Sequence, residues 1–146
     1  MSSNATVKIS EVGDVEAYLL RMSALVRTKA LMAAIAAGCK VVRDRAKELA
    51  PVGDGDLRRS ISYVVREYQD GTVVVGVVGP KRRKAASGKD PGRYGRLVEY
   101  GHQTANRSGG KETVGAHPFL RPAADATEVD QEVAVIASLT QSMKGA

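Results

Sequence analysis

The chain has 146 residues, of which 26% are charged, with one cysteine and no tryptophan. This length suits one domain of common size, and a lone cysteine excludes a disulfide framework and a cysteine-based metal site. No apolar run approaches the roughly 20 residues that cross a bilayer, and residues 1–10 lack the apolar centre of a signal peptide. We therefore expect a soluble single domain over residues 1–146, without export by a signal peptide and without membrane contact.

The net charge of +6 is concentrated in residues 81–96, which we name the basic loop. The rest of the chain carries equal numbers of basic and acidic residues. The basic loop could bind nucleic acid or an acidic protein surface, and the alternative is a solvated loop that keeps the protein soluble. Its basic residues are Lys81, Arg82, Arg83, Lys84, Lys89, Arg93 and Arg96.

The N-terminal third of the chain predicts an arm followed by a long helix. Residues 1–13 are polar and predict an N-terminal arm, whereas residues 15–49 carry apolar side chains at helical spacing. Unbroken, this helix would span roughly 50 Å at 1.5 Å per residue, more than a compact domain needs. We expect either a break near Thr28 or Gly38, or a helix that projects toward another subunit.

Residues 50–61, A-P-V-G-D-G-D-L-R-R-S-I, predict a tight corner between this helix and a strand. Pro51 ends the helix because its ring removes a hydrogen-bond donor. Gly53 and Gly55 allow backbone angles closed to other residues, and Asp54 and Asp56 can bond to their own backbone. An EF-hand would need further oxygen ligands and a closing glutamate, and a phosphate loop would need G-x-x-x-x-G-K-[ST]. We therefore expect a scaffold, with apolar alternation beginning at Leu57.

The middle of the chain predicts a hairpin and two loops around a short helix. Residues 61–68 and 72–78 read as strands, because Asp70-Gly71 between them is a hairpin signal. Valines on both faces of the second strand predict burial on both sides. We expect flexible loops over residues 81–92 and 102–116, with a short helix over residues 93–100 that ends at Gly101.

The C-terminal part predicts a stiff segment and a helix. Residues 117–123, H-P-F-L-R-P-A, hold two prolines around the only phenylalanine. Residues 123–143 predict an amphipathic helix with Ala126, Val129, Val133, Ile136 and Met143 on one face. The elements together predict an α+β fold, in which a long N-terminal helix and a C-terminal helix pack on a small, mainly antiparallel β-sheet with extended loops.

Few side chains are candidates for chemistry. His102 and His117 have no partner at metal-ligand spacing, and no serine lies in a nucleophile motif. We predict no catalytic residue, no metal and no cofactor. Glu99 lies in the stretch Y-G-R-L-V-E-Y-G-H, and a buried carboxylate needs a partner. We expect an ion pair with Arg58 or Arg121 that ties the short helix to the sheet, in preference to a catalytic role.

Five motifs in order resemble the tail-component family of long-tailed bacteriophages, named for gene product ten of the lambdoid phage HK ninety-seven. They are a helix ending in A-P-V, G-x-L-R-x-S-I, V-x-V-G, Y-x-x-x-V-E-[FY]-G and P-F-L-R-P-A, within residues 41–125. The chain departs from the family's P-V-x-T-G, Y-A and E-F-G-T patterns at Asp54, Gly95, Tyr100 and His102. The matching residues are Pro51, Gly55, Leu57, Arg58, Ser60, Ile61, Tyr94, Glu99, Tyr100, Gly101, Pro118, Phe119, Leu120, Arg121 and Pro122.

The resemblance implies a structural virion protein, not an enzyme, that forms a ring in the neck between the head connector and the tail tube. The implied role is head-tail joining or tail completion. The resemblance implies a homohexameric ring as the first expectation and a dodecameric ring as the second. The implied partners are other neck proteins and the tail tube or terminator, in the virion and, during assembly, in the host cytoplasm. Head-to-tail ring contacts need two different patches, which the basic loop and an acidic stretch could supply. The acidic stretch comprises Asp125, Glu128, Asp130 and Glu132.

Two other functions stay open for the basic loop. It could line a channel that DNA crosses, or the chain could be a small cytosolic nucleic-acid-binding protein. Because no aromatic residues are interleaved with its cations, such binding would be nonspecific contact with phosphates. A small nuclease or hydrolase is the third choice, without a set of residues that would carry the chemistry.

Overall fold

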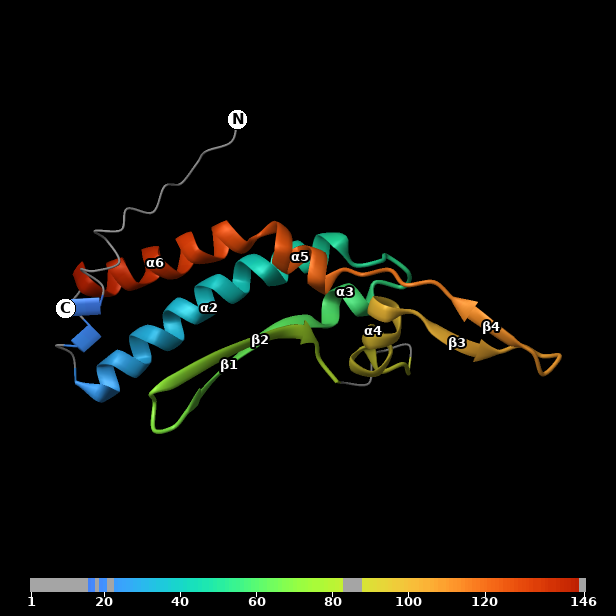
Figure 1. Ribbon diagram of the computed structural model, residues 1–146, viewed down its shortest axis with the longest axis horizontal. Helices are drawn as coiled ribbons and strands as arrows, with labels where there is room; N and C mark the ends of the chain where they lie inside the picture. Colours follow the sequence, from blue (N-terminus) through green and yellow to red (C-terminus); the bar gives the residue numbers. More distant parts are fainter. Residues whose placement is uncertain (1–15, 18, 21–22, 83–87, 145–146) are drawn as a thin grey trace, which may run out of the picture. The chain divides into compact units, whose positions relative to one another are not determined.

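The computed structural model describes residues 16–17, 19–20, 23–82 and 88–144 (Figure 1). It confirms the expected α+β class, with a long N-terminal helix, a C-terminal helix and small antiparallel sheets. The two sheets have two strands each, β1–β2 and β3–β4. The elements are α2 (Ala24–Leu49), α3 (Asp56–Ser60), β1 (Ile61–Tyr68), β2 (Val73–Pro80), α4 (Pro91–Tyr100), β3 (His102–Ala105), β4 (Lys111–Val114), α5 (Leu120–Ala126) and α6 (Glu128–Lys144).

The chain divides into two compact units. Unit 1 comprises the described residues of Met1–Val41, together with Tyr63–Val77 and Thr127–Ala146. Unit 2 comprises Val42–Ser62 and the described residues of Val78–Ala126. Helix α2 and the β1–β2 hairpin contribute residues to both units. Folding as the expected single domain stays a prediction, and the expected arm over residues 1–13 lies outside the described residues.

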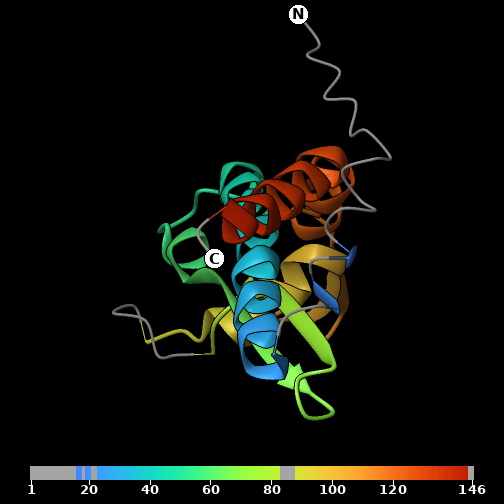
Figure 2. The ribbon, with the colours of Figure 1, turned by 90° about the vertical axis from the view of Figure 1, so that its left-hand side faces the viewer.

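In unit 1, α2 lies between α6 and the β1–β2 hairpin (Figures 1 and 2). Ala30 and Ala34 of α2 are buried against Leu139 of α6, because their small side chains let the two helices approach closely. On the other side of α2, a Cβ at Gly76 of β2 would overlap Cys39 and Ile35. The packing of this unit therefore depends on small residues at both contacts of α2.

Helix α2 differs from the expected helix at its start and at the expected breaks. It begins at Ala24, since Ser23 is not helical, and its 26 residues run through Thr28 and Gly38 without interruption. The alternative of a break near Thr28 or Gly38 is therefore wrong, and the other alternative, a helix that projects toward another subunit, stays a prediction. The Thr28 hydroxyl donates to the carbonyl of Ala24 at 3.0 Å and lies 3.4 Å from that of Gly71, which ties α2 to the hairpin turn.

Helix α6 packs Met143 as predicted but leaves Val129 of the predicted face exposed. Leu139 is buried, with Val135 and Met143 packed beside it, whereas Val129 is 59% exposed. These three packed residues lie four positions apart, so they share one face of the helix. The predicted face is therefore wrong at Val129, because α2 meets the helix along the Val135 side.

The predicted β1–β2 hairpin is confirmed, with a tight turn at Asp70 and Gly71. Both residues have positive φ, and the N–H of Thr72 donates to the carbonyl of Gln69 at 3.1 Å, as in a type I′ turn. The predicted burial of both faces of β2 is wrong, because only one face of the hairpin packs on α2. The valines of the other face are exposed in the described structure, namely Val73, Val75 and Val77.

Unit 2 has its own apolar core and a second hairpin. Loop structure was expected over residues 102–116, yet β3 and β4 pair antiparallel there from His102↔Val114 to Ala105↔Lys111. That expectation is wrong for these two strands, while mobility of the segment stays a prediction. Because seven of their eight residues are exposed, no apolar alternation marks the strands in the sequence. The buried core residues are Ala46, Ala50, Leu57, Ile61, Phe119 and Ala123.

Candidate functional site

The predicted corner at residues 50–61 is held by local hydrogen bonds in unit 2. Asp54 Oδ1 accepts from the N–H of Asp56 at 3.2 Å, and Gly55 has the left-handed φ of 77° that favours glycine. Arg58 Nη2 donates to the carbonyl of Ala50 at 3.3 Å, which fastens the corner to the end of α2. Residues 56–60 form the helical turn α3, so the sheet begins at Ile61 and the strand-like alternation expected from Leu57 is wrong.

Helix α4 is set against this corner by its first residues. Asp90 caps it, with Oδ1 accepting from the N–H of Gly92 at 3.0 Å, and Pro91 occupies the first turn, where no donor is needed. The helix therefore starts two residues before the expected position. One turn further on, Tyr94 and Val98 pack on the core of unit 2.

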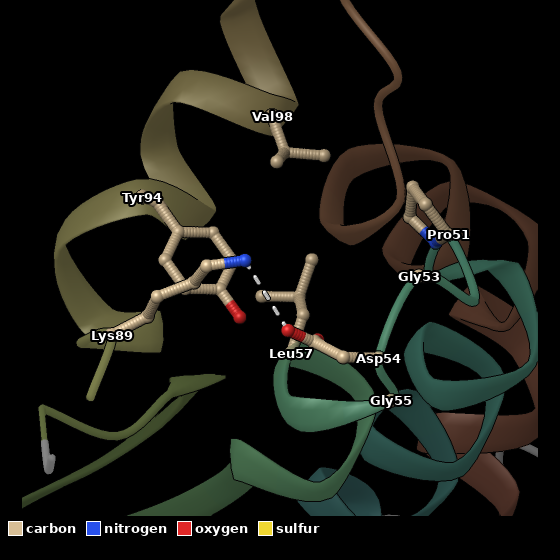
Figure 3. A pocket seen from close by; sticks show the side chains of 8 residues that line it. All are labelled: Pro51, Gly53, Asp54, Gly55, Leu57, Lys89, Tyr94 and Val98. Atoms are coloured by element: carbon tan, nitrogen blue, oxygen red, sulfur yellow. Dashed lines mark hydrogen bonds and ion pairs between the residues drawn. The ribbon is translucent and has the colours of Figure 1, made fainter. Parts of the chain in front are cut away.

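A cavity of about 460 Å³ lies between the corner and α4 (Figure 3). Leu57, Tyr94 and Val98 give it apolar walls, and Asp54 and Lys89 stand together at one side. Lys89 Nζ lies 3.4 Å from Asp54 Oδ2, and both side chains are well exposed. The remaining lining residues are Pro51, Gly53 and Gly55.

The surroundings of Tyr94 raise the pKa of its hydroxyl above the ordinary value. Burial raises its pKa, the carboxylates of Asp54 and Asp56 raise it further, and the Arg59 guanidinium acts in the opposite direction. Among the described residues, this hydroxyl has no hydrogen-bond partner. The cavity therefore combines apolar walls with a neutral hydroxyl, a carboxylate and a lysine.

Glu99 is buried and binds backbone, not arginine. Its Oε2 accepts from the N–H groups of Phe119 and Leu120 at 2.8 and 3.0 Å, and its Oε1 accepts from that of Arg121 at 3.0 Å. The expected ion pair with Arg58 or Arg121 is wrong, because the three free N–H groups at the start of α5 already satisfy the carboxylate. Glu99 thus ties α4 to α5 within unit 2.

The pKa of Glu99 reflects two opposed causes. Burial alone raises the pKa of this carboxyl, but the hydrogen bonds from the N–H groups of Leu120, Phe119 and Arg121 outweigh burial and lower it. The group is therefore ionised near neutral pH and acts as a structural anion. Such a carboxylate is a poor general acid or base, because its proton affinity is too low.

The basic loop is only partly within the described structure. Lys89 pairs with Asp54, and Arg82 lies 3.8 Å from Asp90. Lys81, Arg93 and Arg96 are exposed and make no ion pair within the described ranges. Arg83 and Lys84 fall outside these ranges. The described part of the loop therefore still presents three unpaired cations to solvent.

The acidic stretch is exposed at every position. Asp125 lies on α5 in unit 2, whereas Glu128, Asp130 and Glu132 lie on α6 in unit 1. None of the four forms an ion pair in the part of the chain that the structure covers. The first two acidic residues of α6 also lie in its first turn, where the helix dipole favours negative charge.

Among the described residues, no three acidic, histidine or cysteine side chains gather as a metal site would require. No described helix is long and apolar enough to cross a membrane. His102 is the first residue of β3 and His117 follows β4, and neither belongs to such a group within the described ranges.

Comparison with known proteins gives one match. A family model described as "Bacteriophage HK97-gp10, putative tail-component" matches residues 13–101, more than half of the chain. The chain belongs to this family. No curated protein and no solved structure matches it. The family expected from the five motifs is therefore confirmed, and the chain is a phage tail component in the broad sense that the family describes.

The HK97-gp10-like match includes α2, the corner, the β1–β2 hairpin and α4. The resemblance had started at residue 41, so the match extends further toward the N-terminus. The P-F-L-R-P-A motif lies beyond the matched range, but it supplies the three N–H groups that Glu99 binds. Two of the motifs are thus joined by one buried carboxylate.

Three features of the site could not be predicted from the sequence of this family member: an ion pair, the cavity and the partners of Glu99. The pair of Lys89 and Asp54 joins residues 35 positions apart, and no local pattern connects them. The cavity likewise depends on how α4 packs beside the corner. For Glu99, the apolar surroundings signalled burial, but the backbone partners became visible only through the fold.

Proposed function

We propose that the chain is a structural virion protein of a long-tailed bacteriophage, which forms a ring in the neck between the head connector and the tail tube. Membership of a tail-component family supports this proposal. The observation that carries the finer role is the presence of two oppositely charged, exposed surfaces on one chain. A head-to-tail ring uses two such different surfaces at every interface.

The two surfaces are the basic loop and the acidic stretch. In the basic loop, the exposed cations are Lys81, Arg93 and Arg96. In the acidic stretch, the carboxylates of α5 and α6 are exposed. Opposite charges on neighbouring subunits would steer them together and penalise wrong registers. We propose that the basic loop of one subunit meets the acidic stretch of the next.

The ring is a homohexamer in this proposal, with a dodecamer as the second choice. Other neck proteins and the tail tube or terminator bind its two faces, and the basic loop contacts DNA nonspecifically if it lines the channel. The protein acts in the virion after assembly in the host cytoplasm. It has no catalytic role, no cofactor and no membrane partner in this account.

Charge reversal tests the interface. Lys81→Glu with Arg82→Glu, and separately Glu128→Lys with Asp130→Lys, should each abolish ring formation by the full chain, as measured by light scattering and electron microscopy. Reversal of both surfaces together should restore rings, because the signs again match. Lys111→Glu on β4 is the control and should assemble normally. Rings formed by both single-surface variants would refute the interface.

A second measurement separates this role from nucleic-acid binding. Duplex binding by the isolated full chain is measured across salt concentrations, since each phosphate neutralised adds about 0.9 to the salt slope. Weak binding by the monomer agrees with a neck protein. Tight binding with a steep slope would favour a nucleic-acid-binding protein instead. Particles that assemble but release DNA abnormally after charge reversal would favour the channel.

A further inference from the structure

Helix α4 has a face that unit 2 leaves exposed. The residues of this face lie at i, i+3, i+4 and i+7, so they form one stripe along the helix. Tyr100 is 76% exposed and Leu97 is 43% exposed, although both carry large apolar surfaces. Tyrosine and arginine are enriched at protein interfaces and among the residues that carry most of the binding energy. We name these residues the α4 face: Arg93, Arg96, Leu97 and Tyr100.

Helix α6 has a second apolar face besides the one that packs on α2. Val129, Val133 and Ile136 lie at i, i+4 and i+7, and none of them belongs to the core around Leu139 in the described part of unit 1. Val129 is 59% exposed, and the other two are half-buried. An apolar face that its own chain leaves open is typical of a surface that another chain covers. We name these three residues, with Glu128 and Glu132 at their border, the α6 face.

The two faces carry opposite charges at similar spacing. Arg93 and Arg96 lie one turn apart on α4, and Glu128 and Glu132 lie one turn apart on α6. None of these four side chains makes an ion pair within the described ranges. Each face also places apolar side chains beside its charges. The two helices can therefore bury apolar surface against each other while each guanidinium meets a carboxylate.

We propose that the α4 face of one copy of this chain packs on the α6 face of the next copy. Leu97 and Tyr100 then contact the valines of the α6 face at the centre, and the arginines pair with the glutamates at the border. The partner is a second copy because both complementary faces occur on one chain, as a head-to-tail contact requires. The inference rests on the proposed ring, and it names the two helices that meet and the apolar centre of their contact.

The first test removes the aromatic side chain at the centre of the contact. Association of the full chain is followed by sedimentation over a range of protein concentrations. Tyr100→Ala should weaken association at least about thirtyfold, as expected for a tyrosine at the centre of an interface. Tyr68→Ala is the matched control, because that tyrosine is also exposed but lies on β1, and it should associate like wild type. Normal association of Tyr100→Ala would overturn the contact, and loss of association in Tyr68→Ala alone would assign it to the hairpin instead.

The second test mixes two charge variants. Arg96→Glu and Glu132→Arg should each weaken association at least about tenfold, because each places like charges opposite one another. In an equimolar mixture the two variants can alternate around a ring, so that every contact again joins opposite charges. Rings should therefore form from the mixture at a concentration where neither variant forms them alone. A mixture that assembles no better than its components would overturn the pairing of these two faces.

Failure of this contact is distinguishable from failure of the ring. All the exchanged side chains are exposed, so each variant should melt at the temperature of the wild-type chain under conditions where both are monomeric. A wild-type chain that stays monomeric refutes the ring and the contact together. Wild-type rings that tolerate Tyr100→Ala, or a charge mixture that does not assemble, leave the ring in place and refute the contact between α4 and α6.

Discussion

Replacing Glu99 by glutamine tests the buried carboxylate that joins α4 to α5. Glutamine keeps one oxygen, which can accept the two bonds now made by Oε2, but its amino group would face the N–H of Arg121. Loss of the hydrogen bond from the N–H of Arg121 should lower the free energy of unfolding by about 1.5–3 kcal/mol. The other two hydrogen bonds would no longer have a charged acceptor, which should lower it by about 1 kcal/mol each. Cheaper burial of the neutral amide offsets part of this loss, so we expect unfolding to become easier by about 2–4 kcal/mol.

The assay is denaturant and thermal unfolding of the full chain. For a chain of this size, about 3 kcal/mol corresponds to a decrease in Tm of roughly 6–12 °C. Glu112→Gln is the matched control, because that glutamate is exposed on β4 and should change stability by less than about 0.5 kcal/mol. A Glu99→Gln protein as stable as this control would refute the role of the carboxylate.

The pH dependence gives an independent check of the same carboxylate. The folded pKa of Glu99 lies below its ordinary value, so its stabilisation is fully present above the unfolded pKa of about 4.3. The stabilisation is lost as pH falls through the lower folded pKa. The difference in stability between wild type and Glu99→Gln should therefore shrink as pH falls from about 5 through the lower folded pKa. A difference that stays constant over this range would contradict the argument.

Three further predictions concern packing. Gly76→Ala should destabilise the protein by about 1–3 kcal/mol in urea unfolding, because its Cβ would overlap Cys39 and Ile35, whereas Gly79→Ala meets no atom within 4 Å and should be nearly neutral. Phe119→Ala should cost about 3–5 kcal/mol in the same assay, since the ring is fully buried, and a smaller loss would contradict its place in the core. Cys39 should react with a thiol reagent only on unfolding, because burial raises the pKa of its thiol, and fast labelling of the native chain would refute this.

Much of the fold follows from local sequence signals. Pro51 and Gly55 mark the corner, and Asp70 with Gly71 marks the hairpin turn, because backbone angles and missing donors act within a few residues. These signals also fixed the family, since the motifs are short and keep their order. The wrong predictions share a different cause. The exposure of Val75 and of Val129 depends on which face another element covers, and the exposed strands β3 and β4 carry no apolar pattern.

The sequence by itself determined the long helix, the hairpin over residues 61–78, the short helix that ends at Gly101, the corner and the concentration of positive charge in the basic loop. Only the tertiary structure decided the partners of Glu99, which are backbone N–H groups 20 to 22 positions away. The same holds for Lys89 and Asp54 beside the cavity. The physical reason is that turns and helix ends obey local geometry, whereas a buried charge binds whichever donors packing brings within reach.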